Sequence, residues 1–588
     1  MGTLGIIALA APIAAQTPNV RPARVDWTGE IGSYAEAYGM SGREARRPGE
    51  TGRLYLNSTA KLYGRLSVGL NFVVTTENGA DATLGGLPGR QRLNQFGVSP
   101  QWSWGRAHAG SFSEFYTPYT LSGIRITGGG FDVRPGLLHI GAFGGQSRQA
   151  AFGGLTSGSF DRRILGGRLG VGRPMTGGRR GSYIDVMMVR SWDDPGSLPS
   201  PDDSAYAPFL PDSLATEPDT ALLPRDVVNP FAVTPQENVV VGVTGGLALF
   251  GGRAYLRGEL DGSIHTRDRR ASRLGESTLD ERYSGFLQRL VTPRVGTHAD
   301  HAYRTELDLR FDKLPGATPR SPRSLTATIG YRYVGPGYVS LGSAFLPNDQ
   351  AGIDARATMR IGRTSLHLDG MRQEDNLIGQ KLETTVRNRF GGAITTQPAR
   401  RWSSTLRATR VGMHNGSDDP VRLVDYSAWV LGTSQTFMIG SRSRVRSITG
   451  SFSLQRVGDE NPARTGSRLR SHGGDVRVMF GLAPRFTVTP TAGLVRSTVG
   501  SAPTESRATY GVAADWRSGS GRWSNGLSVM HSQITRTDAL TARLISRVRV
   551  TDSDALVLTL RGNRYRSLVD PKGNFDESIV SLQWARQL

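Results

Sequence analysis

A two-residue alternation of apolar and polar side chains constrains this chain most, and it recurs about every 20 residues from Val25 onward. In residues 447–457, Ile448, Phe452 and Leu454 share one parity, and serine, threonine and glutamine share the other. In residues 305–312 leucine and phenylalanine alternate with charged residues. Such a segment forms a strand with one apolar and one polar face. We therefore expect an all-β protein.

Two architectures use strands of this kind. Soluble sandwiches and propellers pack the apolar face into a core, whereas an outer-membrane barrel turns it toward lipid and lines a polar lumen with the other face. The charges on the polar face, the segment length of about 10 to 15 residues and the absence of a repeated blade signature favour the barrel. Aromatic residues of the apolar parity also stand at segment ends, as in interfacial girdles. These are Trp102, Trp104, Tyr331, Tyr333, Trp402, Trp516 and Trp523.

The pattern predicts a single large antiparallel transmembrane β-barrel of about 26 strands, within a range of about 22 to 28, closed by its first and last strands. Tight links and longer connections should alternate, so that one end carries the long external loops. The expected strands are 25–38, 52–61, 64–76, 91–104, 106–116, 122–134, 137–149, 160–174, 180–193, 238–251, 253–266, 299–313, 322–335, 350–362, 364–375, 384–396, 399–413, 424–439, 442–457, 468–481, 484–498, 505–517, 521–534, 539–550, 554–567 and 577–588.

The composition of the chain excludes several other classes of protein. The chain has no cysteine, which excludes disulfides, thiol catalysis and cysteine-ligated metals. Its formal net charge of +21 comes from basic residues scattered along every segment, so we expect no nucleic-acid partner. No zinc-protease, serine-hydrolase or nucleotide-binding signature is present, and the nine histidines follow no catalytic spacing. We expect no enzyme activity, no catalytic residue, no cofactor and no metal.

The N-terminus has the features of an export signal. Leu4 to Ala15 form a short apolar stretch that ends in small residues. We expect a signal peptide over 1–15, a short periplasmic segment over 16–24 and the barrel over 25–588. Because alternation starts at Val25, we expect neither the plug domain of a TonB-dependent receptor nor the N-terminal periplasmic domain of a lipopolysaccharide-assembly barrel.

The chain resembles bacterial outer-membrane β-barrel proteins. Its last segment alternates through Val580, Leu582 and Trp584 to Leu588 and is similar to the signal that the barrel-insertion machinery reads. A narrower likeness lies in NQFGVSPQWSW (94–104), FYTPYTLSG (115–123), GGGFDVRPG (128–136) and HIGAFGGQ (139–146), which resemble large barrels of the Bacteroidetes and Gemmatimonadetes kind. The resemblance implies the bacterial outer membrane as location. It also implies the lipid bilayer, lipopolysaccharide and the insertion machinery as partners, and it carries no functional residues.

Charged residues of the polar parity are the candidate lumen lining. They form an electrostatic lining that favours anions, or ion-pair ladders that stiffen the wall, or both. The candidates are Arg257, Arg310, Arg332, Arg477, Arg543, Arg547, Arg549, Arg561, Asp261, Asp308 and Asp369.

Two long connections are further candidates. The acidic, proline-rich segment 194–237 either folds over the external mouth as a constriction loop or is a solvated surface loop. Its candidate residues are Asp202, Asp203, Asp212, Glu217, Asp219 and Asp226. In 267–298, Ser277 can cap a short helix with Asp280, and this helix either enters the lumen or lies outside.

These observations favour a passive or gated outer-membrane channel for polar or anionic solutes, because side chains cannot fill so wide a barrel. The alternative is a scaffold or partner-binding barrel whose lumen holds its own loops or another envelope protein.

Overall fold

The computed structural model describes residues 25–76, 94–152, 158–176, 179–198, 233–274, 291–319, 321–343, 345–440 and 444–588. The expected signal peptide 1–15 and segment 16–24 lie outside these residues. So do most of the acidic segment (199–232), including all six of its candidate carboxylates, and the expected helix (275–290).

Alternating segments form one large sheet because each strand carries an apolar and a polar face. The first half of the sheet consists of β1 (Val25–Ser41), β2 (Glu50–Leu62), β3 (Leu66–Thr75), β4 (Gln95–Trp102), β5 (Gly105–Phe115), β6 (Ser122–Val133), β7 (Leu138–Arg148), β10 (Arg162–Gly172), β13 (Tyr183–Asp193), β14 (Glu237–Leu249), β15 (Ala254–Thr266), β16 (Thr297–Phe311) and β17 (Arg323–Val334). The second half consists of β18 (Gln350–Ile361), β19 (Thr364–Glu374), β20 (Val386–Ala399), β21 (Trp402–His414), β22 (Asp425–Met438), β23 (Val445–Asp459), β24 (Leu469–Ala483), β25 (Phe486–Val499), β26 (Glu505–Arg517), β27 (Trp523–Ile534), β28 (Thr537–Arg549), β29 (Asp554–Ser567) and β30 (Phe575–Gln587).

The remaining described elements are small. Two hairpins lie beside the main sheet: β8 (Ala151–Phe152) with β9 (Gly158–Ser159), and β11 (Met175–Thr176) with β12 (Arg179–Arg180). The 3-10 turns are η1 (Pro195–Ser197), η4 (Phe250–Gly252), η5 (Pro462–Ser467) and η6 (Pro571–Gly573). Among the described residues, no helix is both long and apolar enough to cross a bilayer.

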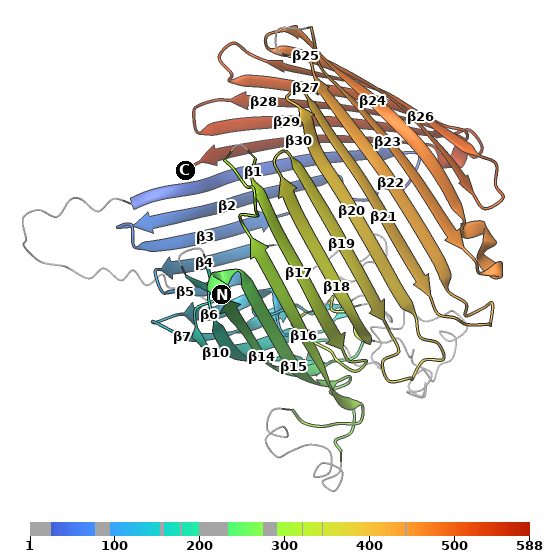
Figure 1. The fold of residues 1–588 in the computed structure, drawn as a ribbon. Helices are drawn as coiled ribbons and strands as arrows, with labels where there is room; N and C mark the ends of the chain where they lie inside the picture. Colours follow the sequence, from blue (N-terminus) through green and yellow to red (C-terminus); the bar gives the residue numbers. More distant parts are fainter. Residues whose placement is uncertain are drawn as a thin grey trace, which may run out of the picture.

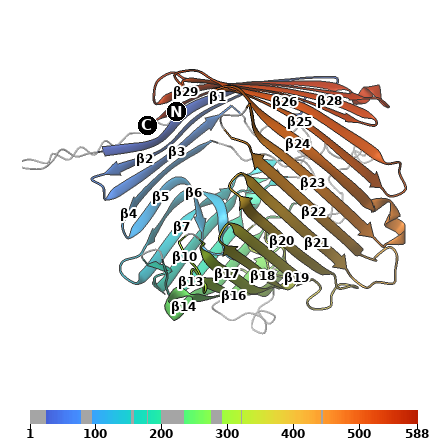
Figure 2. The ribbon, with the colours of Figure 1, turned by 45° about the horizontal axis from the view of Figure 1, so that its top comes forward.

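The sheet closes on itself as a 26-stranded antiparallel barrel. Each strand pairs with its neighbours along the chain, and β1 pairs with both β2 and β30. At this seam, Tyr34 lies opposite Gln583 of β30 and Arg53 of β2. Figures 1 and 2 show the first and last strands side by side in one continuous wall. The predicted strand number and closure are confirmed, and each expected range overlaps one barrel strand.

The two rims of the barrel differ in their connections. One rim carries the links 63–65, 103–104, 134–137, 362–363 and 400–401 and the start of β1 and end of β30. The other carries 116–121, 194–236, 267–296, 335–349 and 375–385. Because such barrels have tight periplasmic turns and longer external loops, we call these the periplasmic and external rims. The predicted alternation of short and long connections holds in part, since 173–182 and 312–322 on the periplasmic rim are longer than 535–536 on the external rim.

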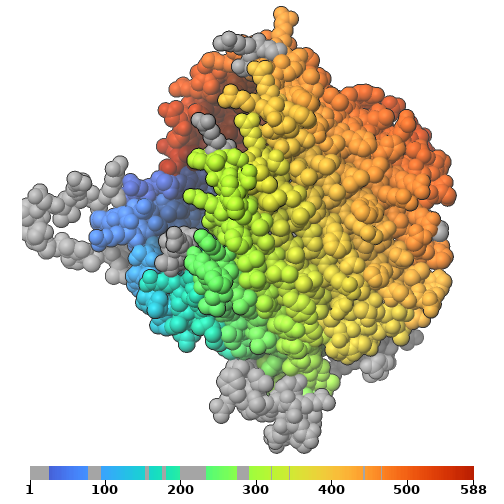
Figure 3. All heavy atoms as spheres, viewed as in Figure 1, coloured from blue at the N-terminus to red at the C-terminus, as the bar shows by residue number. Residues whose placement is uncertain are grey.

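The outer face of the wall is apolar. Leu260, Ile329 and Phe390 are among the large apolar residues exposed on it, and Figure 3 shows the side chains of the yellow and orange strands packed as a continuous surface. Aromatic pairs mark both of its edges: Trp102–Trp104 and Trp516–Trp523 near the periplasmic rim, with ring centroids 5.3 and 6.1 Å apart, and Tyr303–Tyr333 toward the external rim, with ring centroids 5.1 Å apart. A closed barrel with an apolar outer band and aromatic girdles is a protein of the bacterial outer membrane.

Candidate functional site: the lumen

The strand register shows which residues share the inner face of the barrel. Facing partners share a face, so the lumen side can be followed from pair to pair: Glu259 opposes Arg304, Arg304 opposes Arg332, and Arg356 opposes Asp369. Followed in this way, all eleven lumen candidates named from the sequence occupy the inner face.

Several of these candidates form ion pairs along the wall. Arg257 lies 3.9 Å from Glu306, Arg477 lies 3.4 Å from Asp475, and Asp369 lies 3.5 Å from Arg389. Two further pairs are Arg180 with Asp308 and Arg310 with Asp312. Asp261 is an exception, because it is buried beside another carboxylate, Glu259, and forms no ion pair among the described residues. This part of the lining has the form of an ion-pair ladder.

Four of the arginines form a different group, which we call the arginine strip: Arg543, Arg547, Arg549 and Arg561 of β28 and β29. Arg543 faces Arg561 directly in the register. None of the four has a carboxylate within 4 Å among the described residues, as the ion pairs of the described chain show. The only described hydrogen bond from these guanidinium groups runs from Arg561 Nε to Asn563 Oδ1, at 3.4 Å. The strip therefore leaves positive charge uncompensated on the lumen wall.

The inner face of β5–β14 differs from the polar lining that the alternation predicts. Here six apolar side chains point inward and pack together: Phe112, Ile126, Phe143, Ile164, Met187 and Val189. Tyr116 and Leu121 of the 116–121 connection complete this cluster. The one sequence signal of this packing is β13, which carries apolar residues on both faces, and the alternation pattern does not use it. We call this region the packed lobe, and it fills part of the lumen with a dry core.

Two external connections meet above the packed lobe and form what we call the lumen latch, residues 116–121 and 335–343. Tyr338 is 1% exposed and its hydroxyl donates to the Tyr119 carbonyl at 3.1 Å. Ser340 and Ser343 donate to the carbonyls of Thr120 and Pro118 at 2.8 and 2.7 Å. The two connections are thus bonded to each other inside the barrel, although they are separated by most of its first half.

The wall holds the latch from below. The amide of Asn238 on β14 donates to the Val339 carbonyl at 2.9 Å, and its oxygen accepts from the Leu341 N–H at 3.1 Å. Gly242 leaves room for Thr120 and Asp261, since a Cβ there would lie 3.1 Å from Thr120 Cγ2 and 1.9 Å from Asp261 Oδ1. Sequence reasoning missed the latch. The motif FYTPYTLSG was the only signal at its first half, and it pointed to a resemblance rather than a position.

A buried ionic network closes the packed lobe toward the periplasmic rim. His139 bridges two carboxylates, with Nε2 3.0 Å from Asp132 Oδ2 and Nδ1 3.1 Å from Asp185 Oδ2. Arg168 lies 2.6 Å from the same Asp132 oxygen and 4.3 Å above the Tyr116 ring. These groups connect four strands and the base of the latch, so the packed lobe and the latch are joined by buried ionic contacts.

Asp193 anchors the external end of the packed lobe. Its side chain is completely buried, and Arg162 forms a two-point contact with it, Nε–Oδ1 at 2.6 Å and Nη2–Oδ2 at 2.9 Å. Arg148 approaches the same carboxylate at 3.3 Å, and the N–H of Gln236 donates to it at 3.0 Å. A buried carboxylate needs such partners, because an unpaired charge is costly away from water.

A clamp in the external loops fixes the far end of the latch connection. Asp349 accepts from the N–H groups of Leu377 and Asn376 at 2.9 and 3.0 Å, and Lys381 Nζ lies 2.5 Å from it. Burial opposes ionisation, but the Lys381 ammonium and the two N–H donors outweigh it and lower the pKa of Asp349 below its ordinary value.

Acid should therefore release this clamp. A lowered pKa means that the clamp stabilises the loops at neutral pH and that this stabilisation is lost as the pH falls through the pKa of folded Asp349. We expect amides of 375–385 to exchange hydrogen faster at about pH 3 than at about pH 7, after correction for intrinsic rates. Lys381→Met should remove most of this pH difference. Equal protection at both pH values would contradict the clamp.

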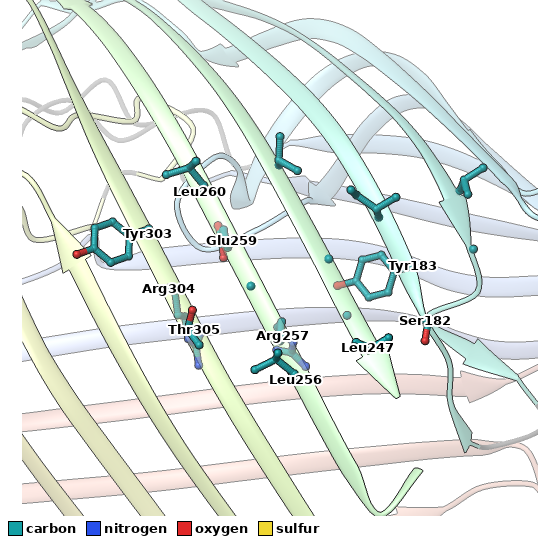
Figure 4. Close-up of a pocket in the computed structure, with 17 residues that line it drawn as sticks. Ser182, Tyr183, Leu247, Leu256, Arg257, Glu259, Leu260, Tyr303, Arg304 and Thr305 are labelled. Atoms are coloured by element: carbon teal, nitrogen blue, oxygen red, sulfur yellow. The ribbon is translucent and has the colours of Figure 1, made fainter. Parts of the chain in front are cut away.

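A hollow on the outer wall is not part of this site. It has a volume of about 890 Å³ and is lined by Val243, Leu247, Leu256 and Leu260 near the paired glycines 245 and 258. Figure 4 shows Leu256, Leu260 and Thr305 on the near side of the strands and Arg257, Glu259 and Arg304 behind them. The hollow thus lies on the lipid-facing side, with the charged residues on the lumen side.

No protein-family model and no curated protein sequence matches this chain. Among solved structures, the alcaligin outer-membrane receptor FauA from Bordetella pertussis is similar at 9% identity, covering 95% of this chain and 76% of that chain, with a TM-score of 0.33. The ferric enterobactin receptor PfeA is similar at 9% identity, covering 96% of this chain and 82% of that chain, with a TM-score of 0.40.

The P pilus usher PapC translocation pore is also similar, at 9% identity, with 96% of this chain and 99% of that chain covered and a TM-score of 0.33. These values describe a likeness among large barrels, and the fold assignment rests on the strand register. The chain is a large outer-membrane β-barrel with a charged lumen that its own connections partly fill.

Proposed function

We propose that this barrel is a gated outer-membrane channel for polar solutes with a preference for anions. The arginine strip carries the proposal, because four lumen-facing guanidinium groups that have no carboxylate partner among the described residues favour negative charge in a pore. The lumen latch supplies the obstruction that a gate requires. In this proposal, solutes pass beside β18–β30, and the packed lobe stays closed until the latch moves.

Several narrower proposals accompany this one. The lipid bilayer, lipopolysaccharide and the insertion machinery are the proposed partners, and the Bacteroidetes and Gemmatimonadetes likeness is a proposal about lineage. The acidic segment 194–237 remains a predicted constriction loop.

Neutralising the arginine strip should reduce anion selectivity. In planar bilayers at about 0.1 M KCl, where the Debye length is about 10 Å, the chloride-to-potassium permeability ratio of the quadruple Arg543→Gln, Arg547→Gln, Arg549→Gln, Arg561→Gln variant should fall toward one. The matched variant with lysine at all four positions keeps the charge and should keep the ratio. A conducting wild-type barrel without anion preference would contradict the solute class.

A second function, a scaffold or partner-binding barrel, is favoured by the latch alone, because the chain's own connections already occupy part of the lumen. The same bilayer recording separates the two functions. Steady conductance supports the channel, whereas a folded barrel that stays silent and co-purifies with another envelope protein supports the scaffold.

A further inference from the structure

A second polar site lies on the lumen wall at the seam. It is a cavity of about 450 Å³ lined by side chains of β30, β1, β2, β3 and β4, and we call it the amide–tyrosine pocket. Its members all lie on the inner face, since each opposes another member or a lumen residue in the register. They are Tyr34, Arg53, Tyr55, Asn57, Val73, Gln95 and Gln583.

The Tyr55 ring is held in place by its neighbours. It faces Gly32 in the register, and a Cβ on Gly32 would lie 2.6 Å from Tyr55 Oη and 2.7 Å from its Cζ. The ring therefore lies over bare backbone. Its hydroxyl donates to Glu30 Oε1 at 2.5 Å and accepts from Gln583 Nε2 at 2.9 Å. The pocket thus has an aromatic floor whose orientation two hydrogen-bonding partners, Glu30 and Gln583, define.

The chemistry of this pocket suits a hydroxyl-rich ring. Amide side chains both donate and accept hydrogen bonds, as sugar hydroxyls do. Tyrosine offers an apolar face beside a polar tip. Glu30 and Glu36, which accept from the two tyrosine hydroxyls, add acceptors at the margin. Pockets of a few hundred cubic ångströms with a few convergent polar groups are typical of small-molecule sites.

The arginine strip continues this pocket along the same rows of the wall. Arg547 opposes Val557, Val557 opposes Gln583, and Gln583 opposes Tyr34. Three strand spacings of about 4.8 Å place Tyr34 roughly 14 Å from Arg547 across the wall. In the next row, Ala555 and Ala585 lie between Arg549 and Gly32, so small side chains leave the path open.

We propose that this part of the lumen binds a short acidic saccharide, with sugar rings in the amide–tyrosine pocket and its carboxylate, sulfate or phosphate groups on the arginine strip. The proposal rests on the channel function above and names its solute class. Guanidinium groups bind such oxyanions through paired N–H donors. The tyrosine ring and the amide side chains of the pocket supply the contacts that distinguish a sugar from any other anion.

Calorimetric titration of the folded barrel in detergent micelles tests this binding without requiring conduction. The three titrants are a trimer of galacturonic acid, the neutral maltotriose and the non-sugar trianion tricarballylate. We expect the acidic trisaccharide to bind most tightly. Tyr55→Leu, and separately the double Arg547→Gln, Arg549→Gln variant, should each raise its Kd at least about tenfold, which corresponds to about 1.4 kcal/mol.

The controls separate this site from general effects. Tyr426→Leu removes a lumen-facing tyrosine on β22, away from the seam, and should leave the Kd unchanged. Tyr55→Phe keeps the ring, so it should weaken binding less than Tyr55→Leu. Equal affinity for tricarballylate, equal loss in Tyr426→Leu, or no binding by a folded barrel would overturn the saccharide site. A barrel that conducts anions selectively but does not bind the trisaccharide would retain the channel function and lose this inference.

Discussion

Replacing Arg162 with alanine should destabilise the folded barrel by about 3–5 kcal/mol, because it leaves the Asp193 carboxylate buried with only part of its charge compensated. Arg162 supplies the two shortest contacts to a side chain that has no exposed surface. Arg148 remains at 3.3 Å but does not bind in the same two-point geometry. Equilibrium unfolding in urea from lipid vesicles measures the change.

A matched surface pair provides the control for this prediction. Arg310 and Asp312 lie 2.7 Å apart, but their side chains are 66% and 70% exposed. Arg310→Ala should therefore cost less than about 1 kcal/mol. Adding Asp193→Asn to Arg162→Ala removes the stranded charge and should recover part of the stability. Similar losses of unfolding free energy for Arg162→Ala and Arg310→Ala would show that the burial of Asp193 does not explain the contribution of the Arg162–Asp193 pair to stability.

Replacing residues 337–343 with a glycine–serine linker of equal length should increase the single-channel conductance about twofold, the order expected if the packed lobe opens beside the wider part of the lumen. The replacement removes the Tyr338, Ser340 and Ser343 contacts and frees the 116–121 connection. Bilayer recordings under one salt condition measure the step size. The change acts on an obstruction and not on charge, so the chloride-to-potassium ratio should move little.

An equal-length replacement of residues 416–422 makes the control, because this connection also lies on the external rim but forms no part of the latch. Its conductance should match that of the wild type. An unchanged conductance in the latch variant would mean that the network around His139 seals the packed lobe without help from the latch.

The barrel itself is predictable from sequence because its signal is local and repeated. A strand facing lipid on one side and water on the other must alternate, and β24 through β30 do so almost without interruption. The same alternation assigns the inner face, so the arginine strip follows from parity alone. The absence of described carboxylates within 4 Å of these arginines does not follow from parity, because cross-strand neighbours depend on register.

The latch and the amide–tyrosine pocket could not be predicted for a related reason. The connection 335–343 has the glycine, proline and serine content of an ordinary loop, and only its partner 116–121 makes it part of the interior. The pocket combines β30 with β1–β4, so its members come from opposite ends of the chain. No local pattern indicates that Gln583 donates to Tyr55.

The seam between β1 and β30 also affects assembly. These strands are the first and last of the sheet, so their edges stay unsatisfied until synthesis has ended, and unpaired backbone is costly in lipid. Contacts this distant in sequence also tend to form slowly. A molecule that touches Tyr34, Tyr55 and Gln583 together bridges both sides of the joint. By mass action it would favour the closed barrel over an open precursor, so the bound solute would also stabilise the closure of the barrel.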